Sequence, residues 1–356
     1  MTAPAPSPAP VAGADPAIVG PYLARVLSDA AWTKATVSLI SGGKSNLTYR
    51  VDSPSGSLVL RRPPLGQILP TAHDMWREFR VMSGLQSTAV PVPEMLHFCA
   101  DADVLGQPFY VMERIEGHIV TTQFPEGYAS TPADKGLISN GLLDALASLH
   151  TVDYPSVGLG EFGRPESYLA RQVNRWSKQW DATRIDGMEF VDELAASLAA
   201  SLPPTHRSSI VHGDFRLDNT MLHPTEPGRI NAVLDWEMST LGDPLADLGI
   251  LLVYWIQADD NDIRTGGSVV SAVTMLPGFL TRDEVAAGYA ERTGADISEL
   301  PWYLAFGFFK LAVVCAGIVM RAQLGAMVGS GFDGFAERIP PLIELGRATL
   351  ADRKLY

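Results

Sequence analysis

Apolar and polar residues alternate along the first third of the chain, and apolar residues recur at helical spacing along most of the rest. Alternation over residues 36–40, 46–52 and 57–62 predicts three strands, and residues 108–115 predict one more. From residue 131 onward, apolar positions recur every three or four residues, which is the spacing of the buried face of a helix. The pattern therefore predicts an α+β fold in which an antiparallel sheet precedes a mainly helical part.

Helices are expected where apolar stripes combine with capping residues or prolines at their ends. The expected ranges are 15–28, 71–82, 131–151, 165–184, 188–202, 281–293, 298–324 and 335–351. In the second of these, we expect Thr71 to cap the helix and Asp74 to replace the usual Glu of a capping box. Residues 306–320 are strongly apolar but short for a membrane span and include Lys310, so a buried helix is expected there.

The change from strand to helix pattern divides the chain into three expected segments. Residues 1–15 are rich in Ala and Pro without Lys or Arg, and we expect a disordered tail. Residues 16–115 hold the predicted sheet and form a first lobe. Residues 116–356 form a second, helical lobe, with a hinge beside Gly117.

Composition limits the class of protein. The 356 residues are 46% hydrophobic, enough for one large core or two smaller ones. A net charge of −13 argues against a nucleic-acid partner, which is bound through clustered Lys and Arg. Only Cys99 and Cys315 are present, both in apolar surroundings, which indicates buried thiols in a reducing cytoplasm rather than a disulfide framework. No membrane partner is expected, and oligomeric state has no signal in the sequence.

Chemically active residues gather around two short apolar runs. Residues 210–211 lead into His212, Asp214 and Asn219, and residues 230–234 lead into Asp235. We expect two strands whose adjacent ends bring the carboxylates and the amide together. In phosphoryl transfer a carboxylate orients the acceptor hydroxyl and takes its proton, which is the role predicted for Asp214. Mg²⁺ prefers oxygen ligands, which Asn219 and Asp235 offer.

These motifs carry a family resemblance. The stretch HGDFRLDN at residues 212–219, followed by LDWE at 234–237, resembles the aminoglycoside phosphotransferase family and, in its spacing, the catalytic loop of protein kinases. The stretches PPLGQILP at 63–70 and AHDMWREFRV at 72–81 resemble phosphotransferase modules fused to acyl-CoA dehydrogenases. The resemblance implies a protein-kinase-like, two-lobed α+β fold that uses ATP and Mg²⁺ to phosphorylate a hydroxyl group of a small molecule.

The first lobe is then the expected nucleotide lobe. A turn at Gly42 and Gly43, with Ser45 beside it, would let backbone N–H groups approach a phosphate, although such a turn is also an ordinary hairpin connection. The kinase lysine position falls at Arg61 by resemblance, and whether Arg61 or Arg62 acts there stays open.

Two further features of this lobe follow the kinase pattern. Glu78 is expected to pair with Arg61, the alternative being a Glu that faces solvent. The resemblance also implies that Met112 lies behind the adenine, and that the Glu113 carbonyl and the Ile115 N–H bond its edge. An ordinary edge strand fits the same residues.

The second lobe contains expected supporting residues. His212 is expected to bond backbone near Asp235 rather than bind zinc. Arg216 is expected to pair with a neighbouring acid, Asp243 to cap a helix and Asp247 to accept backbone hydrogen bonds from the catalytic loop. Aromatic residues of the last third are expected either in the core or beside an acceptor pocket: Tyr289, Trp302, Tyr303, Phe306 and Phe309.

Three functions remain open. A phosphotransferase for aminoglycoside-like polycations should line its cleft with acids. A kinase for a hydroxyacyl or acyl-CoA-type acceptor of lipid metabolism needs cations there, and the basic helix expected at 165–184 is one source, although such charges are more often a solvated face. A non-catalytic nucleotide-binding pseudokinase would keep the fold and lack a catalytic group.

Overall fold

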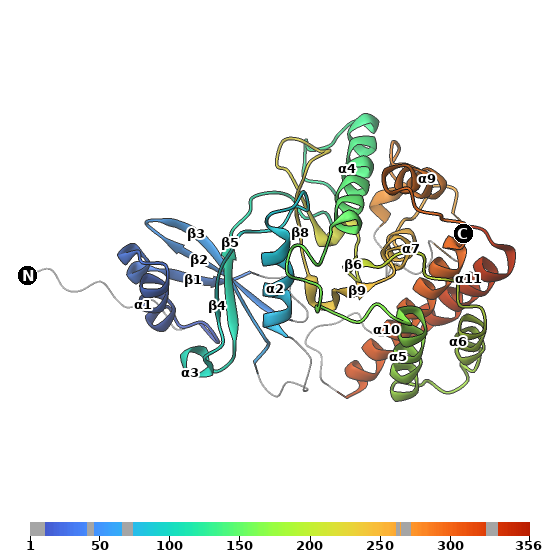
Figure 1. The fold of residues 1–356 in the computed structure, drawn as a ribbon, viewed down its shortest axis with the longest axis horizontal. Coiled ribbons are helices and arrows are strands. Elements are labelled where there is room, and N and C mark those ends of the chain that lie inside the picture. Colours follow the sequence, from blue (N-terminus) through green and yellow to red (C-terminus); the bar gives the residue numbers. More distant parts are fainter. Residues whose placement is uncertain (1–10, 41–45, 66–73, 261–263, 265–271, 325–333) are drawn as a thin grey trace, which may run out of the picture. The chain divides into compact units, whose positions relative to one another are not determined.

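The computed structural model describes residues 11–40, 46–65, 74–260, 264, 272–324 and 334–356 (Figure 1). The chain forms two compact units. The first comprises Met1–Glu116 and Asp235–Glu237, and the second comprises Gly117–Leu234 and Met238–Tyr356. The first unit therefore includes three residues that lie far along the sequence, which no sequence pattern indicated.

The first unit contains a five-stranded antiparallel sheet in the order β1-β2-β3-β5-β4. Its strands are β1 Thr36–Leu39, β2 Leu47–Ser53, β3 Gly56–Arg62, β4 Met95–Cys99 and β5 Phe109–Glu113. Its helices are α1 Pro16–Val26, α2 Met75–Leu85 and α3 Ala102–Leu105, with a 3₁₀ turn at Ala30–Lys34. Strand β4 was not predicted, because its five residues, MLHFC, are apolar apart from one histidine and do not alternate with polar residues.

Residues 11–15, the C-terminal end of the expected disordered tail, pack against the first unit. Ala14 is fully buried in the core beside Val19, Leu23 and Tyr49. The Tyr49 hydroxyl donates a hydrogen bond to the Ala12 carbonyl at 2.6 Å, which ties this segment to the sheet. Residues 11–15 therefore belong to the folded unit because they cover apolar surface, and residues 1–10 lie outside the described residues.

The start of α2 also differs from the prediction. The cap is Asp74, whose carboxylate accepts a hydrogen bond from the Arg77 N–H at 3.0 Å. Asp74 therefore precedes the helix and does not occupy its third position. Thr71, the predicted cap, lies outside the described residues.

Helices form most of the second unit (Figure 1). They are α4 Pro132–Thr151, α5 Tyr168–Ala182, α6 Phe190–Ala200, α7 Leu245–Val253, α9 Arg282–Thr293, α10 Leu300–Gln323 and α11 Ile339–Asp352. Helices α4 and α9 begin with the capping boxes Thr131–Asp134 and Thr281–Glu284. Helix α10 packs against α5, α6, α7 and α11. Among the described residues α10 alone is long and apolar enough to cross a membrane, but 78% of its most apolar window is buried within the protein, as in a core helix.

Two small antiparallel sheets carry the loops of interest in the second unit. Strand β6 Ser209–Val211 pairs with β9 Thr240–Gly242, and β7 Thr220–Leu222 pairs with β8 Ile230–Val233. The strands expected at 210–211 and 230–234 are therefore present as β6 and β8, and each pairs with a short strand that the sequence analysis did not predict, β9 and β7 respectively. Strands β7 and β9 have three residues each, which are too few to produce a clear alternation in the sequence.

Candidate functional site

The catalytic-loop motif follows β6 and begins with a constrained glycine. Gly213 has φ +86°, a backbone conformation that L side chains rarely adopt. A Cβ at this position would lie 2.8 Å from the Met238 carbonyl oxygen. Gly213 therefore permits both the turn after His212 and the close approach of residue 238.

Asp214 and Asn219 lie together at the end of this turn. The Asn219 amide Nδ2 donates to the Asp214 carboxylate Oδ2 at 2.8 Å and to the Asp214 carbonyl at 2.8 Å. Arg216 Nε lies 3.3 Å from the same carboxylate oxygen. The Asp214 side chain is 23% exposed, so its carboxylate is held by the protein but remains accessible to a hydroxyl group.

His212 links two strand ends, as the sequence predicted. Its Nε2 lies 2.8 Å from the Leu234 carbonyl oxygen, and its Nδ1 accepts a hydrogen bond from the Asp214 N–H at 3.2 Å. The Leu234 N–H donates to the Asn219 carbonyl at 2.8 Å. Asp235 follows Leu234 directly, so these contacts fix the backbone one residue before the predicted metal ligand.

The buried carboxylate of Asp247 accepts hydrogen bonds from the backbone of this loop. The His212 N–H donates to Oδ2 at 2.6 Å and the Gly213 N–H donates to Oδ1 at 2.7 Å, which confirms the predicted bracing role. His150 Nε2 lies 3.2 Å from Oδ2, and its Nδ1 lies 2.7 Å from the Tyr289 hydroxyl. Burial opposes ionisation of Asp247, but its hydrogen bond and charge interaction with His150 and the other contacts hold its pKa below the usual value.

Asp243, the second acid of this segment, has the predicted capping contact. Its carboxylate accepts a hydrogen bond from the Leu245 N–H at 3.1 Å at the start of α7. The Tyr303 hydroxyl donates to its other oxygen at 2.8 Å. Arg216 pairs with Asp218 at 2.9 Å in addition to Asp214, as expected for a cation in an acidic loop.

His150 and Lys310 are supporting residues whose contacts sequence reasoning missed. His150 lies at the end of α4 and is fully buried against Asp247. The Lys310 ammonium group donates to the Gly213 carbonyl and lies 5.3 Å from the centre of the Trp176 ring. A single lysine within the apolar stretch of α10 was the available signal, because a buried ammonium group requires polar partners.

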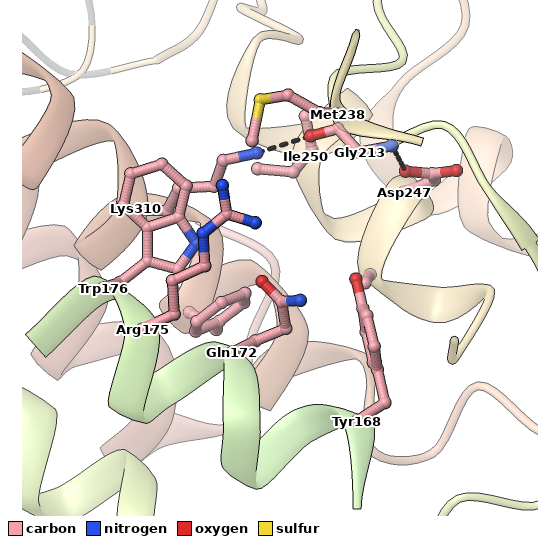
Figure 2. A pocket seen from close by; sticks show the side chains of 11 residues that line it. Tyr168, Gln172, Arg175, Trp176, Gly213, Met238, Asp247, Ile250 and Lys310 are labelled. Carbon is pink, nitrogen blue, oxygen red and sulfur yellow. Dashed lines mark hydrogen bonds between the residues drawn. The ribbon is translucent and has the colours of Figure 1, made fainter. Parts of the chain in front are cut away.

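A pocket opens beside this loop (Figure 2). It has about 360 Å³ of space, part of it open to solvent, between α5, α7, α10 and the backbone at Gly213. Its polar lining residues include Tyr168, Gln172, Arg175 and Lys310. Of the aromatic residues that we considered for an acceptor pocket, Phe306 lines this one, whereas Tyr289, Trp302, Tyr303 and Phe309 are buried in the core.

In the first unit Arg61 occupies the predicted cation position. Its Nε lies 3.0 Å from Glu78 Oε2, so the expected pairing is present and the alternative of a solvent-facing Glu78 is wrong. Glu78 is 1% exposed and also accepts hydrogen bonds from Asn46 at 2.9 Å and from the Tyr110 hydroxyl at 2.8 Å. Burial raises the pKa of Glu78, and the Arg61 charge opposes this rise without cancelling it.

Arg62 has a different task. Its guanidinium donates to the carbonyls of Gly13 at 2.7 Å, Leu105 at 2.9 Å and Pro63 at 3.2 Å. These contacts fasten the segment before α1 to the end of α3. Arg62 is thus occupied by backbone carbonyls and only 3% exposed, and phosphate binding by Arg61 stays a prediction.

Asp235, the predicted metal ligand, also belongs to the first unit. Arg61 Nη2 donates to its Oδ1 at 2.8 Å, and its side chain is 38% exposed. Asp235 has φ +66°, a left-handed conformation that is uncommon for residues other than Gly. Such a conformation costs about 1–3 kcal/mol and is frequent at functional sites.

The remaining nucleotide-site predictions stay predictions. Met112 is buried in β5, which ends at Glu113, so Ile115 lies beyond the strand and not within it. The Glu113 side chain is exposed and its N–H donates to the Glu94 carbonyl at 2.8 Å. Gly42, Gly43 and Ser45 lie outside the described residues.

Asn219 and Asp235, which lie in different units, each keep an oxygen of the kind that binds magnesium. Asn219 uses its amide nitrogen on Asp214, which leaves its amide oxygen, and Asp235 uses one carboxylate oxygen on Arg61, which leaves the other. Carboxylate and amide oxygens are hard ligands of the type that Mg²⁺ prefers. No group of three or more His, Cys, Asp and Glu residues placed to hold a metal ion occurs within the described part of the chain.

Replacement of Arg61 tests the buried ion pair. We expect Arg61→Met to lower the free energy of unfolding by about 3–5 kcal/mol, because Glu78 loses its cation in a buried position. The pKa of Glu78 is raised by folding, so protonated Glu78 stabilises the folded protein at low pH, and this contribution is lost as pH rises through the folded pKa. Above that pKa Glu78 is charged, and the charge of Arg61 is then needed to stabilise it. The deficit of the variant should therefore be larger at about pH 8 than at about pH 5 in denaturant unfolding.

Two further variants make this result specific. Adding Glu78→Gln to Arg61→Met should recover part of the lost stability. Arg50→Met, which breaks an exposed pair with Asp52 at 2.7 Å, should cost at most about 1 kcal/mol. A deficit for Arg61→Met that does not change with pH contradicts the assignment.

Comparison with known proteins shows the family of the chain. A model of the phosphotransferase enzyme family, APH, matches residues 36–303. Acyl-CoA dehydrogenase family member 11 of Rattus norvegicus is 37% identical over 316 residues, which make up 87% of this chain and 40% of the relative. The chain thus spans about two fifths of the length of that relative.

Solved structures share the fold. That of a putative aminoglycoside phosphotransferase from Ralstonia eutropha JMP134 is similar over 95% of this chain and 98% of its own, with a TM-score of 0.80 and 33% identity. A thermostable mutant of the aminoglycoside phosphotransferase APH(4)-Ia, in a ternary complex with AMP-PNP and hygromycin B, matches with a TM-score of 0.59 and 17% identity over 93% of this chain and 98% of its own. The predicted kinase-like α+β fold is confirmed. By the family match over residues 36–303, which is most of its length, the chain belongs to the phosphotransferase enzyme family.

Proposed function

We propose that this protein transfers the γ-phosphoryl group of ATP to a hydroxyl group of a small molecule. The observation that carries the proposal is Asp214, an accessible carboxylate held by Asn219 on a loop whose backbone is fixed by Asp247, His212 and Lys310. Family membership supports a phosphotransferase, and AMP-PNP in the APH(4)-Ia complex supports a nucleoside triphosphate as donor.

Each residue has a defined part in the proposed reaction. Asp214 orients the acceptor hydroxyl by accepting its proton in a hydrogen bond and takes that proton as the new P–O bond forms. Arg61, fixed in direction by Glu78, offers positive charge to the phosphates. Asn219 and Asp235 would hold Mg²⁺, which supplies neutralising charge to the phosphate oxygens when bound.

The three alternative functions differ in the acceptor molecule, or in having none. Hygromycin B is the aminoglycoside of the APH(4)-Ia complex, and the name of the rat relative suggests acyl-CoA chemistry instead. Arg175 and Lys310 in the pocket favour an acceptor of the hydroxyacyl or acyl-CoA type, because a polycation would be repelled there. A pseudokinase is less favoured, since Asp214, Asn219, Asp235 and the Arg61–Glu78 pair are all present.

An ATP-consumption screen tests the function directly. Hydroxylated metabolites, hydroxyacyl thioesters and aminoglycosides are incubated with Mg²⁺, ATP and either the wild-type protein or Asp214→Asn. We expect acceptor-dependent ADP release from the wild type and almost none from the variant. ADP release that does not depend on an acceptor, or that survives in Asp214→Asn, would count against the proposed transfer.

A further inference from the structure

The pocket of Figure 2 has an unusual balance of charge. Arg175 and Lys310 are its cations, and Asp247 is the one acid that lines it. Both oxygens of that acid are engaged, by the N–H groups of Gly213 and His212 and by His150. The two cations outnumber this acid, so the charges of the lining residues do not balance.

The two cations gather around one indole ring. The Arg175 guanidinium carbon lies 5.9 Å from the centre of the Trp176 ring, and Lys310 Nζ lies 5.3 Å from the same centre. Neither cation forms a salt bridge with any residue that the structure describes. Burial, the largest effect, lowers the pKa of Lys310, and the charge of Arg175 adds to this, whereas the charges of Asp214 and Asp247 oppose it.

Lys310 has hydrogen-bonding capacity to spare. An ammonium group has three donors, and the contact known among the described residues is with the Gly213 carbonyl (Figure 2). Lys310 is 7% exposed, so its remaining donors cannot simply be left to bulk water. Gln172 and Tyr168 add an amide and a hydroxyl group from α5 to the lining of the same pocket.

We infer that this pocket is an anion subsite for the acceptor, which carries a carboxylate or a phosphate group in addition to its reacting hydroxyl. An anion between Arg175 and Lys310 relieves the repulsion of the two cations and provides acceptors for their unused donors. That the bound molecule is the acceptor rests on the proposed function, but binding of an anion in this pocket does not require catalysis.

The subsite is also connected to the catalytic loop. Lys310 contacts the carbonyl of Gly213, whose peptide bond leads into Asp214. An acceptor anchored at Lys310 is therefore held next to the residue that is proposed to orient its hydroxyl. This arrangement selects molecules in which the acidic group and the hydroxyl are close together.

Matched probe molecules test the subsite without a catalytic assay. 3-Hydroxybutyrate, butane-1,3-diol and 4-aminobutan-2-ol share a carbon skeleton and differ in charge, and glycerol 3-phosphate and glycerol form a phosphate pair. Binding is measured by titration in saturation-transfer difference NMR. We expect at least one anionic probe to bind about tenfold or more tightly than its neutral and cationic counterparts, as charge-assisted hydrogen bonds imply. The pair that shows the preference tells carboxylate from phosphate.

Variants assign the preference to the pocket. Arg175→Gln and Lys310→Met should each remove most of it, whereas Lys178→Gln, which removes an exposed cation from the same helix outside the pocket, should retain it. If Lys310→Met fails to fold, Arg175→Gln decides, because Arg175 is exposed. Asp214→Asn should keep the anion preference and lose phosphoryl transfer, which distinguishes failure of the subsite from failure of the proposed function. Equal binding of all probes, no binding of either anion, or an unchanged preference in Arg175→Gln would overturn the inference.

Discussion

Asp214→Asn is expected to reduce the rate of phosphoryl transfer by roughly 10²–10⁴-fold, the usual contribution of a general base. The amide that replaces the carboxylate cannot take a proton from the acceptor hydroxyl. Asn219 donates to both the carbonyl and the carboxylate of Asp214, so the variant keeps one of these contacts and its loop should remain folded. Acceptor-dependent ADP release and the melting temperature are the quantities to measure.

A neighbouring acid provides the control. Asp218 lies in the same loop and pairs with Arg216 at 2.9 Å, but no catalytic role is assigned to it. Asp218→Asn makes the same chemical change four residues away and should retain most of the activity. If both variants lose activity equally, or if Asp214→Asn retains the wild-type rate, Asp214 is not the base.

Asp247→Ala is expected to lower the free energy of unfolding by about 3–5 kcal/mol and to abolish activity together with it. The change leaves the N–H groups of His212 and Gly213 and the ring of His150 without their buried partner. Each stranded donor costs about 1–3 kcal/mol. Denaturant unfolding measures the loss, with Asp192→Ala as an exposed control whose pair with Arg184 at 2.6 Å contributes about 1 kcal/mol or less.

The pH dependence provides a second reading of the same residue. Because the pKa of Asp247 is lower in the folded protein than its usual value of 3.8, its contribution to stability is present above that value. The contribution is lost as pH falls through the folded pKa. The wild type should therefore lose stability more steeply than Asp247→Ala below about pH 4. Parallel curves for the two proteins would mean that Asp247 is not held as a charged acceptor.

Short motifs predicted the local chemistry well where one side chain acts on its own loop. The positions of Asp214 and Asn219 after the strand at 210–211 led us to expect a carboxylate and an amide close together, and the Asn219 amide nitrogen lies 2.8 Å from the Asp214 carboxylate. The pairing of Glu78 with Arg61 was predicted from the resemblance to kinases, and the structure has it.

Longer-range support was harder to predict. Nothing in the sequence links His150 on α4, Asp247 on α7 and Lys310 on α10, although all three act on the two peptide groups around Gly213. Strands β4, β7 and β9 were not predicted, because they are short. Strands of three to five residues carry too few positions for alternation to be recognised.

The sequence by itself determined the α+β class, the family resemblance and the residues of the phosphoryl-transfer motif, because periodicity and motif spacing are properties of the chain. Only the tertiary structure showed that Arg61 pairs with Glu78 whereas Arg62 binds backbone carbonyls, buried Ala14 in the core, and placed two cations and an indole around a pocket beside Gly213. Those features depend on contacts between buried groups of elements that are distant in the sequence. Partner choice in the interior follows from packing and desolvation, which a linear pattern does not contain.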